Sequence, residues 1–406
     1  MKTRYSLISL AVLAALSSGA QAQVAIDVIG GSEITFEGLL QTDYNWYSED
    51  LNSPVFDNDP ADGRSYDANL RRAELILKGK GPGMWNWVLG YDAFANKFLD
   101  ANVAYRMGDN YFTVGQYKQP NSLEELTSTK NNDFQSKAMT TNLFAVARRV
   151  GASYAYLSPN FGGSASFYGN ELTPNESPSL GTGNGFGVRG YYAPINTDAH
   201  FLHLGLSYID MDVRNSSNQE IARLRVRPDA DLSAARLIDT GNFAADSLSV
   251  FGIETAYVQG PFRFQGEYMD NTFSRPTGFA DFDANSFYAY GIWNITGETW
   301  GYRNGVITTP LPNNPNLGMW QVGVRYDNAN LNDGSVDFTV PNAPVVKGIL
   351  GGEEDNWTLG VNWYWRSNFK VQLNYVMVNS SKYNTVTKTV LDNNPDITTL
   401  RLQFYW

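Results

Sequence analysis

Apolar and polar residues alternate along much of the chain, so that every second side chain is apolar. In one long example, Trp357, Leu359 and Val361 alternate with Thr358 and Gly360. A period of two predicts β-strands with one apolar face and one face in contact with water. Comparable stretches occur at residues 85–91, 202–208, 320–326 and 369–377. Because a soluble β-sandwich produces the same alternation, the pattern by itself leaves a soluble or a membrane protein open.

Three further features favour a membrane β-barrel. The polar faces of the predicted strands are rich in Asn, Gln and Gly, which suits a water-filled lumen better than a second packed core. The last strand ends in Phe404, Tyr405 and Trp406, which is similar to the C-terminal signal of bacterial outer-membrane barrels. Aromatic residues also lie at the ends of predicted strands, as the interfacial girdles of a membrane barrel require: Tyr44, Trp46, Trp363, Trp365 and Tyr375.

Short turns and long loops alternate along the chain, as in bacterial barrels with short periplasmic turns and longer outer loops. Counting the strands with both termini on the periplasmic side gives about 16, a size that leaves an aqueous channel. The connection from Gly297 to Pro315 is unusually long for the periplasmic side. We therefore predict an all-β fold, a roughly 16-stranded antiparallel transmembrane β-barrel with an inward-folded constriction loop.

The N-terminal residues form a secretory signal pattern. A basic start at Lys2 and Arg4 precedes a short apolar run and a small-residue Ala-x-Ala site that ends at Ala22. This combination is typical of a cleaved signal peptide. We predict a signal peptide at residues 1–22 and one barrel domain over residues 23–406.

The composition narrows the classes of partner and chemistry. The chain has 406 residues, of which 43% are hydrophobic and only 17% charged, with a formal net charge of -11. An acidic chain is a poor partner for nucleic acid, because phosphate backbones attract clustered Lys and Arg. The absence of cysteine excludes a disulfide scaffold, a thiolate zinc site and a catalytic thiol.

Enzymatic chemistry has few candidate residues in this sequence. The histidines are His200 and His203. His203 shares a strand face with Ser207, but four strand residues separate the two by about 13 Å, too far for a nucleophile and its base. Since nothing else resembles a catalytic triad or a metal site, we predict no enzyme activity, no cofactor and no metal.

The best candidate for the constriction loop is the long connection from Gln119 to Ala147. Three hydroxyl residues precede a lysine in this connection: Thr127, Ser128, Thr129 and Lys130. A second lysine, Lys137, follows. Hydroxyls beside a lysine can replace part of the hydration shell of an oxyanion, since charge-assisted hydrogen bonds are stronger than neutral ones. The alternative interpretation is an ordinary polar surface loop.

A row of arginines gives a sharper signal. Arg223, Arg225 and Arg227 alternate with apolar residues, so an extended chain places the three guanidinium groups on one face at steps of roughly 6.6 Å. An anion could pass from one to the next without full dehydration. The alternative is a solvated basic segment that three nearby carboxylates neutralise: Asp229, Asp231 and Asp239. The spacing alone favours neither interpretation.

Other charged residues are placed by alternation alone. Arg71 and Arg72 are adjacent, so we expect them to point to opposite faces of a strand, with only one in the lumen. Alternation also places four charged residues in the lumen: Glu254, Arg263, Glu267 and Arg325. A mixed set of this kind can pair and stiffen the wall instead of selecting ions.

With these residues in view, the chain resembles the phosphate- and polyphosphate-selective porins of Gram-negative outer membranes, the porin O and P type. The resemblance covers essentially the whole mature chain and rests on the order and spacing of short motifs. These motifs are Asn69-Leu-Arg71-Arg72-Ala73, Gly115-Gln-Tyr-Lys118-Gln-Pro120, Ser122-Leu-Glu124, Leu126-Thr-Ser-Thr-Lys130, Arg149-Val-Gly151, Ile238-Asp-Thr-Gly241, Ile295-Thr-Gly-Glu298 and Leu359-Gly-Val-Asn-Trp-Tyr364.

The resemblance implies a trimer of barrels, each with an arginine ladder that leads to a basic constriction. The residues that match the ladder by position are Arg223, Arg225 and Arg227, and those that match the constriction are Arg71, Arg72 and Lys130. Taken with the loop and alternation arguments, the predicted anion pathway consists of Arg223, Arg225, Arg227, Arg71, Arg72, Lys130, Thr127, Ser128, Thr129, Lys118, Lys137 and Arg325.

The chain also departs from the family pattern. Leu39 follows Gly38 where phosphate-specific members have an arginine, and Gln135-Ser-Lys137 stands where many have Glu-Arg. Residues 23–35 lack the lysines that line the inner vestibule of the best-known members. These departures argue against a tight phosphate site and leave a preference for anions in place.

The sequence therefore predicts an outer-membrane homotrimeric porin of a Gram-negative bacterium. Its expected task is passive diffusion of phosphate, pyrophosphate or polyphosphate, with binding weak enough to permit release. A broader small-anion or general porin is the nearest alternative. A structural or receptor barrel and, more distantly, a lipid-degrading enzyme are alternatives from other classes.

Overall fold

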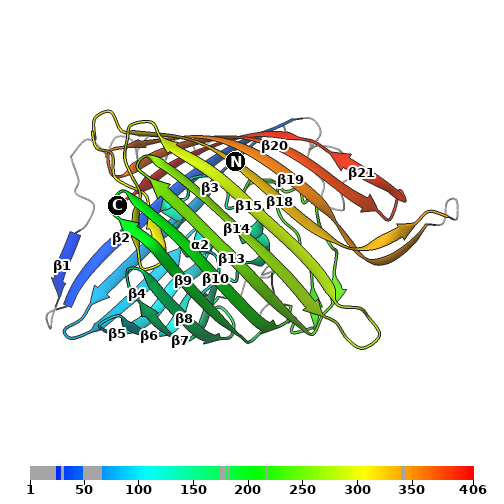
Figure 1. The fold of residues 1–406 in the computed structure, drawn as a ribbon, viewed down its shortest axis with the longest axis horizontal. Helices are drawn as coiled ribbons and strands as arrows, with labels where there is room; N and C mark the ends of the chain where they lie inside the picture. The colour runs from blue at the N-terminus through cyan, green and yellow to red at the C-terminus, as the bar shows by residue number, and fades with distance from the viewer. Residues whose placement is uncertain are drawn as a thin grey trace, which may run out of the picture.

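The computed structural model describes residues 24–28, 32–48, 66–173, 180, 183–215, 217–339 and 344–406. The predicted signal peptide and its cleavage site lie outside the described residues, so both stay predictions. The described residues form one large β-barrel with loops folded into its interior (Figure 1).

The wall of the barrel is one antiparallel sheet that closes on itself. Within the described residues, sixteen strands pair in chain order, and the last strand returns to the first through pairs from Leu39↔Tyr405 to Tyr47↔Ile397. The wall strands are β2 (Ser32–Tyr47), β3 (Tyr66–Lys80), β4 (Trp85–Asp92), β5 (Lys97–Met107), β6 (Asn110–Lys118), β7 (Arg148–Leu157), β8 (Phe161–Tyr168), β9 (Gly185–Thr197), β10 (His200–Asp212), β13 (Ser247–Gln259), β14 (Phe262–Ser274), β15 (Phe282–Asn294), β18 (Met319–Asp337), β19 (Val345–Trp365), β20 (Phe369–Asn384) and β22 (Asp396–Tyr405). The predicted all-β, 16-stranded antiparallel barrel is confirmed.

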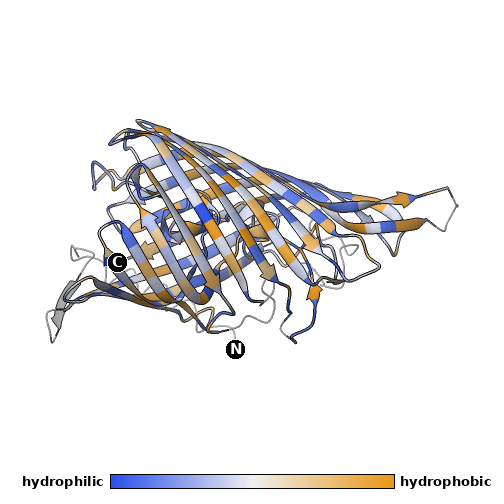
Figure 2. Ribbon diagram, turned by 60° about the horizontal axis from the view of Figure 1, so that its bottom comes forward, coloured by the Kyte–Doolittle hydropathy of each residue, from blue (hydrophilic) through white to orange (hydrophobic). Residues whose placement is uncertain are grey.

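Burial alternates along the wall strands, as the sequence predicts. In β10, Leu204 and Leu206 are 43% and 54% exposed, whereas His203 is completely buried. Hydrophobic and hydrophilic residues alternate along the strands in Figure 2. The apolar side chains point outward, where lipid takes the place of a protein core, and the polar ones point into the lumen.

The connections at the two ends of the barrel differ in length. Short turns at residues 81–84, 108–109, 158–160, 198–199, 260–261 and 366–368 lie at the end that holds the C-terminus. At the opposite end, β18 and β19 extend past the other strands, and so does β20 with its partner β21 (Thr389–Asn393) (Figure 1). A further strand, β1 (Val24–Val28), pairs with β2.

Two short hairpins lie between wall strands. They are β11 (Ile221–Ala222) with β12 (Phe243–Ala244), and β16 (Gly301–Arg303) with β17 (Val306–Thr308). The second hairpin belongs to the long connection that the sequence places at the short-turn end. Its Tyr302 ring stacks on Phe201 of β10, with 4.8 Å between ring centroids, so the hairpin folds into the lumen. Asn304 and Gly305 both have positive φ, 52° and 77°, as a tight two-residue turn requires.

Apolar side chains from the loops pack against the inner face of the wall. Met139 and Leu143 of one loop and Leu224 and Val226 of another join one buried cluster with inward-facing residues of β10, β13, β14 and β15. This packing holds both loops inside the barrel and leaves their polar residues to line the remaining space. No helix among the described residues is long and apolar enough to cross a membrane.

Candidate pore constriction

The loop between β6 and β7, residues 119–147, crosses the lumen, and the predicted inward fold is confirmed. It contains α2 (Leu123–Leu126), η2 (Thr129–Asn131) and α3 (Met139–Phe144). Its contacts reach β14, β18, β20 and β22, far around the barrel from its own strands. We call it the constriction loop.

Charged residues of β14 hold one side of the constriction loop. The carboxylate of Glu267 accepts hydrogen bonds from the backbone N–H groups of Leu123 and Glu124 at 3.0 and 2.8 Å, at the start of α2. Arg263 forms an ion pair with Asp133 at 2.7 Å. Alternation places both wall residues in the lumen, and these contacts confirm it. Both side chains bind the loop directly, so their role is to position it.

Arg325 of β18 holds the middle of the constriction loop. Its guanidinium contacts Asp229 at 3.0 Å and Asp327 at 2.5 Å, and it donates to the Ser136 carbonyl at 2.8 Å. The side chain is completely buried. Because two carboxylates balance its charge and the chain covers it, Arg325 joins the constriction loop to the loop that carries Asp229. Its predicted contact with a passing anion is not supported by this geometry.

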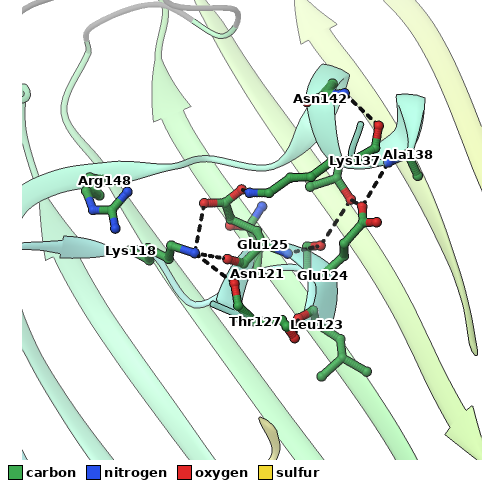
Figure 3. Close-up of polar contacts among 12 residues, drawn as sticks. Lys118, Asn121, Leu123, Glu124, Glu125, Thr127, Lys137, Ala138, Asn142 and Arg148 are labelled. Carbon is green, nitrogen blue, oxygen red and sulfur yellow. Dashed lines mark hydrogen bonds and ion pairs between the residues drawn. The ribbon is translucent and has the colours of Figure 1, made fainter. Parts of the chain in front are cut away.

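A compact charged cluster joins the loop to the end of β6 (Figure 3). Lys118 and Lys137 both contact the carboxylate of Glu125, and Lys118 also donates to the Thr127 carbonyl at 3.1 Å. Burial on its own raises the pKa of a carboxyl group, but the two lysines lower the pKa of Glu125 to about 2. Arg148 of β7 lies on the same side and pairs with Asp100 at 3.0 Å. In this cluster, Lys118 and Lys137 share the carboxylate of Glu125, beside the Arg148–Asp100 ion pair.

The residues of the predicted hydroxyl and lysine segment lie in different environments and have different contacts. Thr127 is buried and donates its hydroxyl to the Leu123 carbonyl at 2.8 Å, so it closes the turn of α2. Ser128 is exposed, and Thr129 is half-buried at the start of η2. The ammonium of Lys130 lies 5.3 Å from the centre of the Tyr405 ring, and burial lowers its pKa. The structure thus places Lys130 beside β22 and not beside Thr127.

Burial alternates along the predicted row of arginines. Leu224 and Val226 are buried against the wall at 0% and 3% exposure, whereas the three arginines between and around them are half-buried or exposed. Arg223 pairs with Asp239, with 2.8 Å between Nε and Oδ1. Burial on its own raises the pKa of Asp239. The contact with Arg223 lowers it, and the pKa of this carboxyl lies below its ordinary value. Within the described residues, no carboxylate contacts the side chains of Arg225 and Arg227: Arg227 donates to the Ser233 carbonyl at 2.8 Å.

Arg71 and Arg72 both face the lumen, so the expectation of opposite faces is wrong. Gln41 of β2 pairs with Arg72 and the next residue, Thr42, pairs with Leu70, which leaves Arg71 as the extra residue of a β-bulge. A bulge breaks the alternation of side chains at that point. Arg72 contacts Glu74 at 3.4 Å, and Arg71 reaches a carboxylate of an inward loop.

That carboxylate is Asp231, which joins the arginine row to the constriction. Its Oδ2 accepts from Arg71 at 2.9 Å and from Arg401 of β22 at 3.0 Å, and its Oδ1 accepts from the Ser136 hydroxyl at 3.1 Å. Burial raises the pKa of a carboxyl group, but these arginines together with Arg72 hold the pKa of Asp231 well below its usual range. Asp231 is therefore ionised at any physiological pH.

Sequence reasoning misses two cations of this region. Arg401 alternates with Leu400 and Leu402 in the last strand, so its inward direction was readable from the pattern. Arg148 follows directly on the constriction loop, where a charged residue looks like part of a solvated segment. Within the described residues, no group of three or more His, Asp or Glu side chains is arranged to hold a metal ion.

Comparison with known proteins agrees with this architecture. A family model described as phosphate-selective porin O and P matches residues 41–406. The chain is 26% identical to Porin O of Pseudomonas aeruginosa over 453 aligned positions, which cover 98% of this chain and 97% of that protein. It is also 29% identical to an uncharacterized protein of Caulobacter vibrioides over 331 residues, which cover 77% of this chain and 63% of the relative. The chain thus spans less than two thirds of the length of the Caulobacter relative.

Among solved structures, the anion-selective porin of Comamonas acidovorans superposes with a TM-score of 0.55 at 14% identity, over 92% of this chain and 100% of that one. At this identity the likeness concerns the fold. The barrel and the family match identify a porin of the Gram-negative outer membrane and not an enzyme. The chain belongs to the phosphate-selective porin O and P family.

Proposed function

We propose that the protein lets small oxyanions, among them phosphate, pyrophosphate and polyphosphate, diffuse passively through an arginine-lined lumen. The observation that carries this proposal is the row of arginines on an inward loop, which leads to Arg71 and Arg72 beside the constriction loop. Guanidinium groups suit this task because they stay charged and match the geometry of carboxylate and phosphate oxygens.

The proposed pathway has a graded charge. Within the described residues no carboxylate forms a contact ion pair with Arg225 or Arg227, although the charge of Asp231 acts on Arg227, whereas Arg223 is paired with Asp239. Beyond the row, Arg71 forms an ion pair with Asp231, and Arg72 forms one with Glu74. Partial neutralisation keeps binding weak, and a channel needs binding that is weak enough to release the ion.

The two lysines of the constriction extend the pathway past the loop. Lys118 and Lys137 share the carboxylate of Glu125, which forms an ion pair with both of them. Ser128 and Thr129 are the open hydroxyls on the same loop and Lys130 lies further along it. We propose these residues as lining of the inner part of the path, and we assign Thr127 and Arg325 to holding the loop.

We also propose that the protein is a homotrimer. β4 and β8 have 8 residues each, fewer than the 9–11 that a tilted strand needs to cross the hydrocarbon layer. This low part of the wall carries strongly exposed apolar side chains, with Val114 64% and Phe167 72% exposed. A neighbouring subunit would cover such a wall better than lipid. Light scattering of the detergent-solubilised protein tests this: a mass of one chain would contradict it.

Planar-bilayer recordings of the purified porin test the proposed function. In a potassium chloride gradient, the reversal potential should show that anions permeate better than cations, and millimolar phosphate should reduce the chloride current. Replacing Arg223, Arg225 and Arg227 together with Ala should lower the anion-to-cation permeability ratio. A cation-selective wild-type pore would refute the proposal, and an unchanged ratio in the triple variant would remove the arginine row from the path. If sulfate reduces the current as well as phosphate does, the protein is a broader oxyanion porin.

A further inference from the structure

Asp231 occupies a site that has the donor set of an oxyanion site. Its two oxygens accept three hydrogen bonds, from Arg71 and Arg401 at 2.9 and 3.0 Å and from the Ser136 hydroxyl at 3.1 Å. Two guanidinium groups and a hydroxyl are donors that also bind a free carboxylate, sulfate or phosphate. The loop thus places its own carboxylate where an anion in transit would bind.

Two of the three donor residues, Arg401 and Ser136, are held by contacts other than Asp231. Arg401 is held by Asp43 through two hydrogen bonds of 2.7 and 2.6 Å and donates to the Gln135 carbonyl at 2.6 Å. Ser136 belongs to the constriction loop, which Arg325 fixes through the carbonyl of the same residue. Arg71 is the extra residue of the β3 bulge and lies between Leu70 and Arg72, which both pair with β2.

The backbone around Asp231 is also held by other contacts. Asp229 is paired with Arg325 at 3.0 Å, and Ala230 is buried at 1% exposure in a cluster with Val376 and Ile397 of the wall. The carboxylate of Asp231 is therefore a side chain presented by an anchored turn, and its removal does not remove the anchors. The site is also open to the lumen, since the side chain of Arg71 is 29% exposed and that of Asp231 15% exposed.

We propose that Asp231 is a tethered competitor for the transported anion, and that Arg71, Arg401 and the Ser136 hydroxyl form an oxyanion site which this carboxylate keeps filled. A tethered group is present at a high effective concentration, so a free anion competes with it at a disadvantage. The competition keeps affinity low at this charged point of the path, which favours throughput over retention. This inference rests on the proposed function, because it names the residues that set affinity in the same path.

Substitution of Asp231 by Asn tests the inference through phosphate block. An uncharged amide in place of the carboxylate cannot neutralise two guanidinium groups, so the site opens to a free anion. The half-blocking concentration of inorganic phosphate on the chloride current should fall at least about tenfold, which is about 1.4 kcal/mol of affinity. Adding Arg71→Gln to this variant should return the half-blocking concentration towards that of the wild type. Asp337→Asn is the charge control, because Asp337 is exposed at the far end of β18.

The outcomes separate the inference from the proposed function. Reversal potentials of the wild type decide whether the pore prefers anions at all. If it does, and the half-blocking phosphate concentration of Asp231→Asn lies within about twofold of the wild-type value, Asp231 is not a competitor. The assignment would also be overturned if the stronger phosphate block of Asp231→Asn persists after Arg71→Gln is added, or if Asp337→Asn alone produces the same stronger block. If Asp231→Asn does not assemble, as judged by heat-modifiable mobility, Asp231→Ser decides by the same criterion.

Discussion

Replacing Arg325 with Met should loosen the constriction and raise the conductance of the pore. Arg325 links the constriction loop, the Asp229 loop and β18 through two carboxylates and one carbonyl. Methionine has a similar length but no charge, so Asp229 and Asp327 would remain buried without their cation. Removing one partner of a buried ion pair costs about 3–5 kcal/mol. At about 1.4 kcal/mol per factor of ten, the undocked loops become roughly a hundred to several thousand times more populated.

Single-channel recordings in planar bilayers measure this effect. The Arg325→Met pore should show a larger mean conductance, more current noise and a lower anion-to-cation permeability ratio, because both loops carry pore-lining cations. Arg366→Met is the matched control, since Arg366 is exposed in a short turn. Arg325→Lys keeps the charge but loses the forked geometry, so we expect an intermediate pore. A correctly assembled Arg325→Met pore with wild-type conductance and noise would refute the reasoning.

Three further predictions concern the Lys118 cluster and the luminal hairpin. Glu125→Gln removes the carboxylate that neutralises Lys118 and Lys137, so the permeability ratio from reversal potentials should shift towards anions; a shift towards cations would contradict it. Because the folded pKa of Glu125 is lowered to about 2, its ion pairs stabilise the loop above the unfolded pKa of about 4.5 and are lost only as the pH falls through about 2. Selectivity set by this cluster should therefore stay constant between pH 7 and 5. Tyr302→Phe removes the 2.8 Å hydrogen bond to His203 and should destabilise the hairpin by about 1 kcal/mol, seen as a lower melting temperature with unchanged selectivity.

The architecture of the barrel can be predicted from the sequence because the residues of each wall strand show by themselves which face of the strand is apolar. Alternation at residues such as Leu204 and Leu206 reports which side chains face lipid, and this depends on the strand alone. Loop length likewise identifies residues 119–147 as the inward segment. These features are local, so a single sequence contains them.

The candidate site is less readable because its contacts join residues that are distant in the chain. Asp229 and Asp231 follow the arginine row in sequence, yet they pair with Arg325, Arg71 and Arg401 of the wall. Of the three carboxylates in the solvated alternative, Asp239 forms an ion pair with a member of the row, whereas Asp229 and Asp231 form theirs with the wall. These residues meet only because the barrel closes around the loops. The spacing of residues in the sequence does not show which of them will meet.

The bulge at Arg71 shows a second limit of pattern reading. A strict period of two predicts that adjacent arginines point to opposite faces. Because β3 contains one extra residue at this point, Arg71 points into the lumen as Arg72 does. The extra residue becomes visible only against the partner strand β2. A sequence therefore predicts the period of a strand better than its interruptions.

The hairpin of β16 and β17 has a mechanical consequence for the pore. The carbonyl of Asn131 in the constriction loop accepts a hydrogen bond from Thr309, just after this hairpin, at 3.2 Å. The loop thus has a brace on its short-turn side, and the hairpin in turn rests on Phe201 of the wall. A solute that pushes inward through the pore presses the loop against this support instead of bending it aside. The size limit for permeation should accordingly be sharp, with an abrupt fall in rate between solutes of neighbouring diameter.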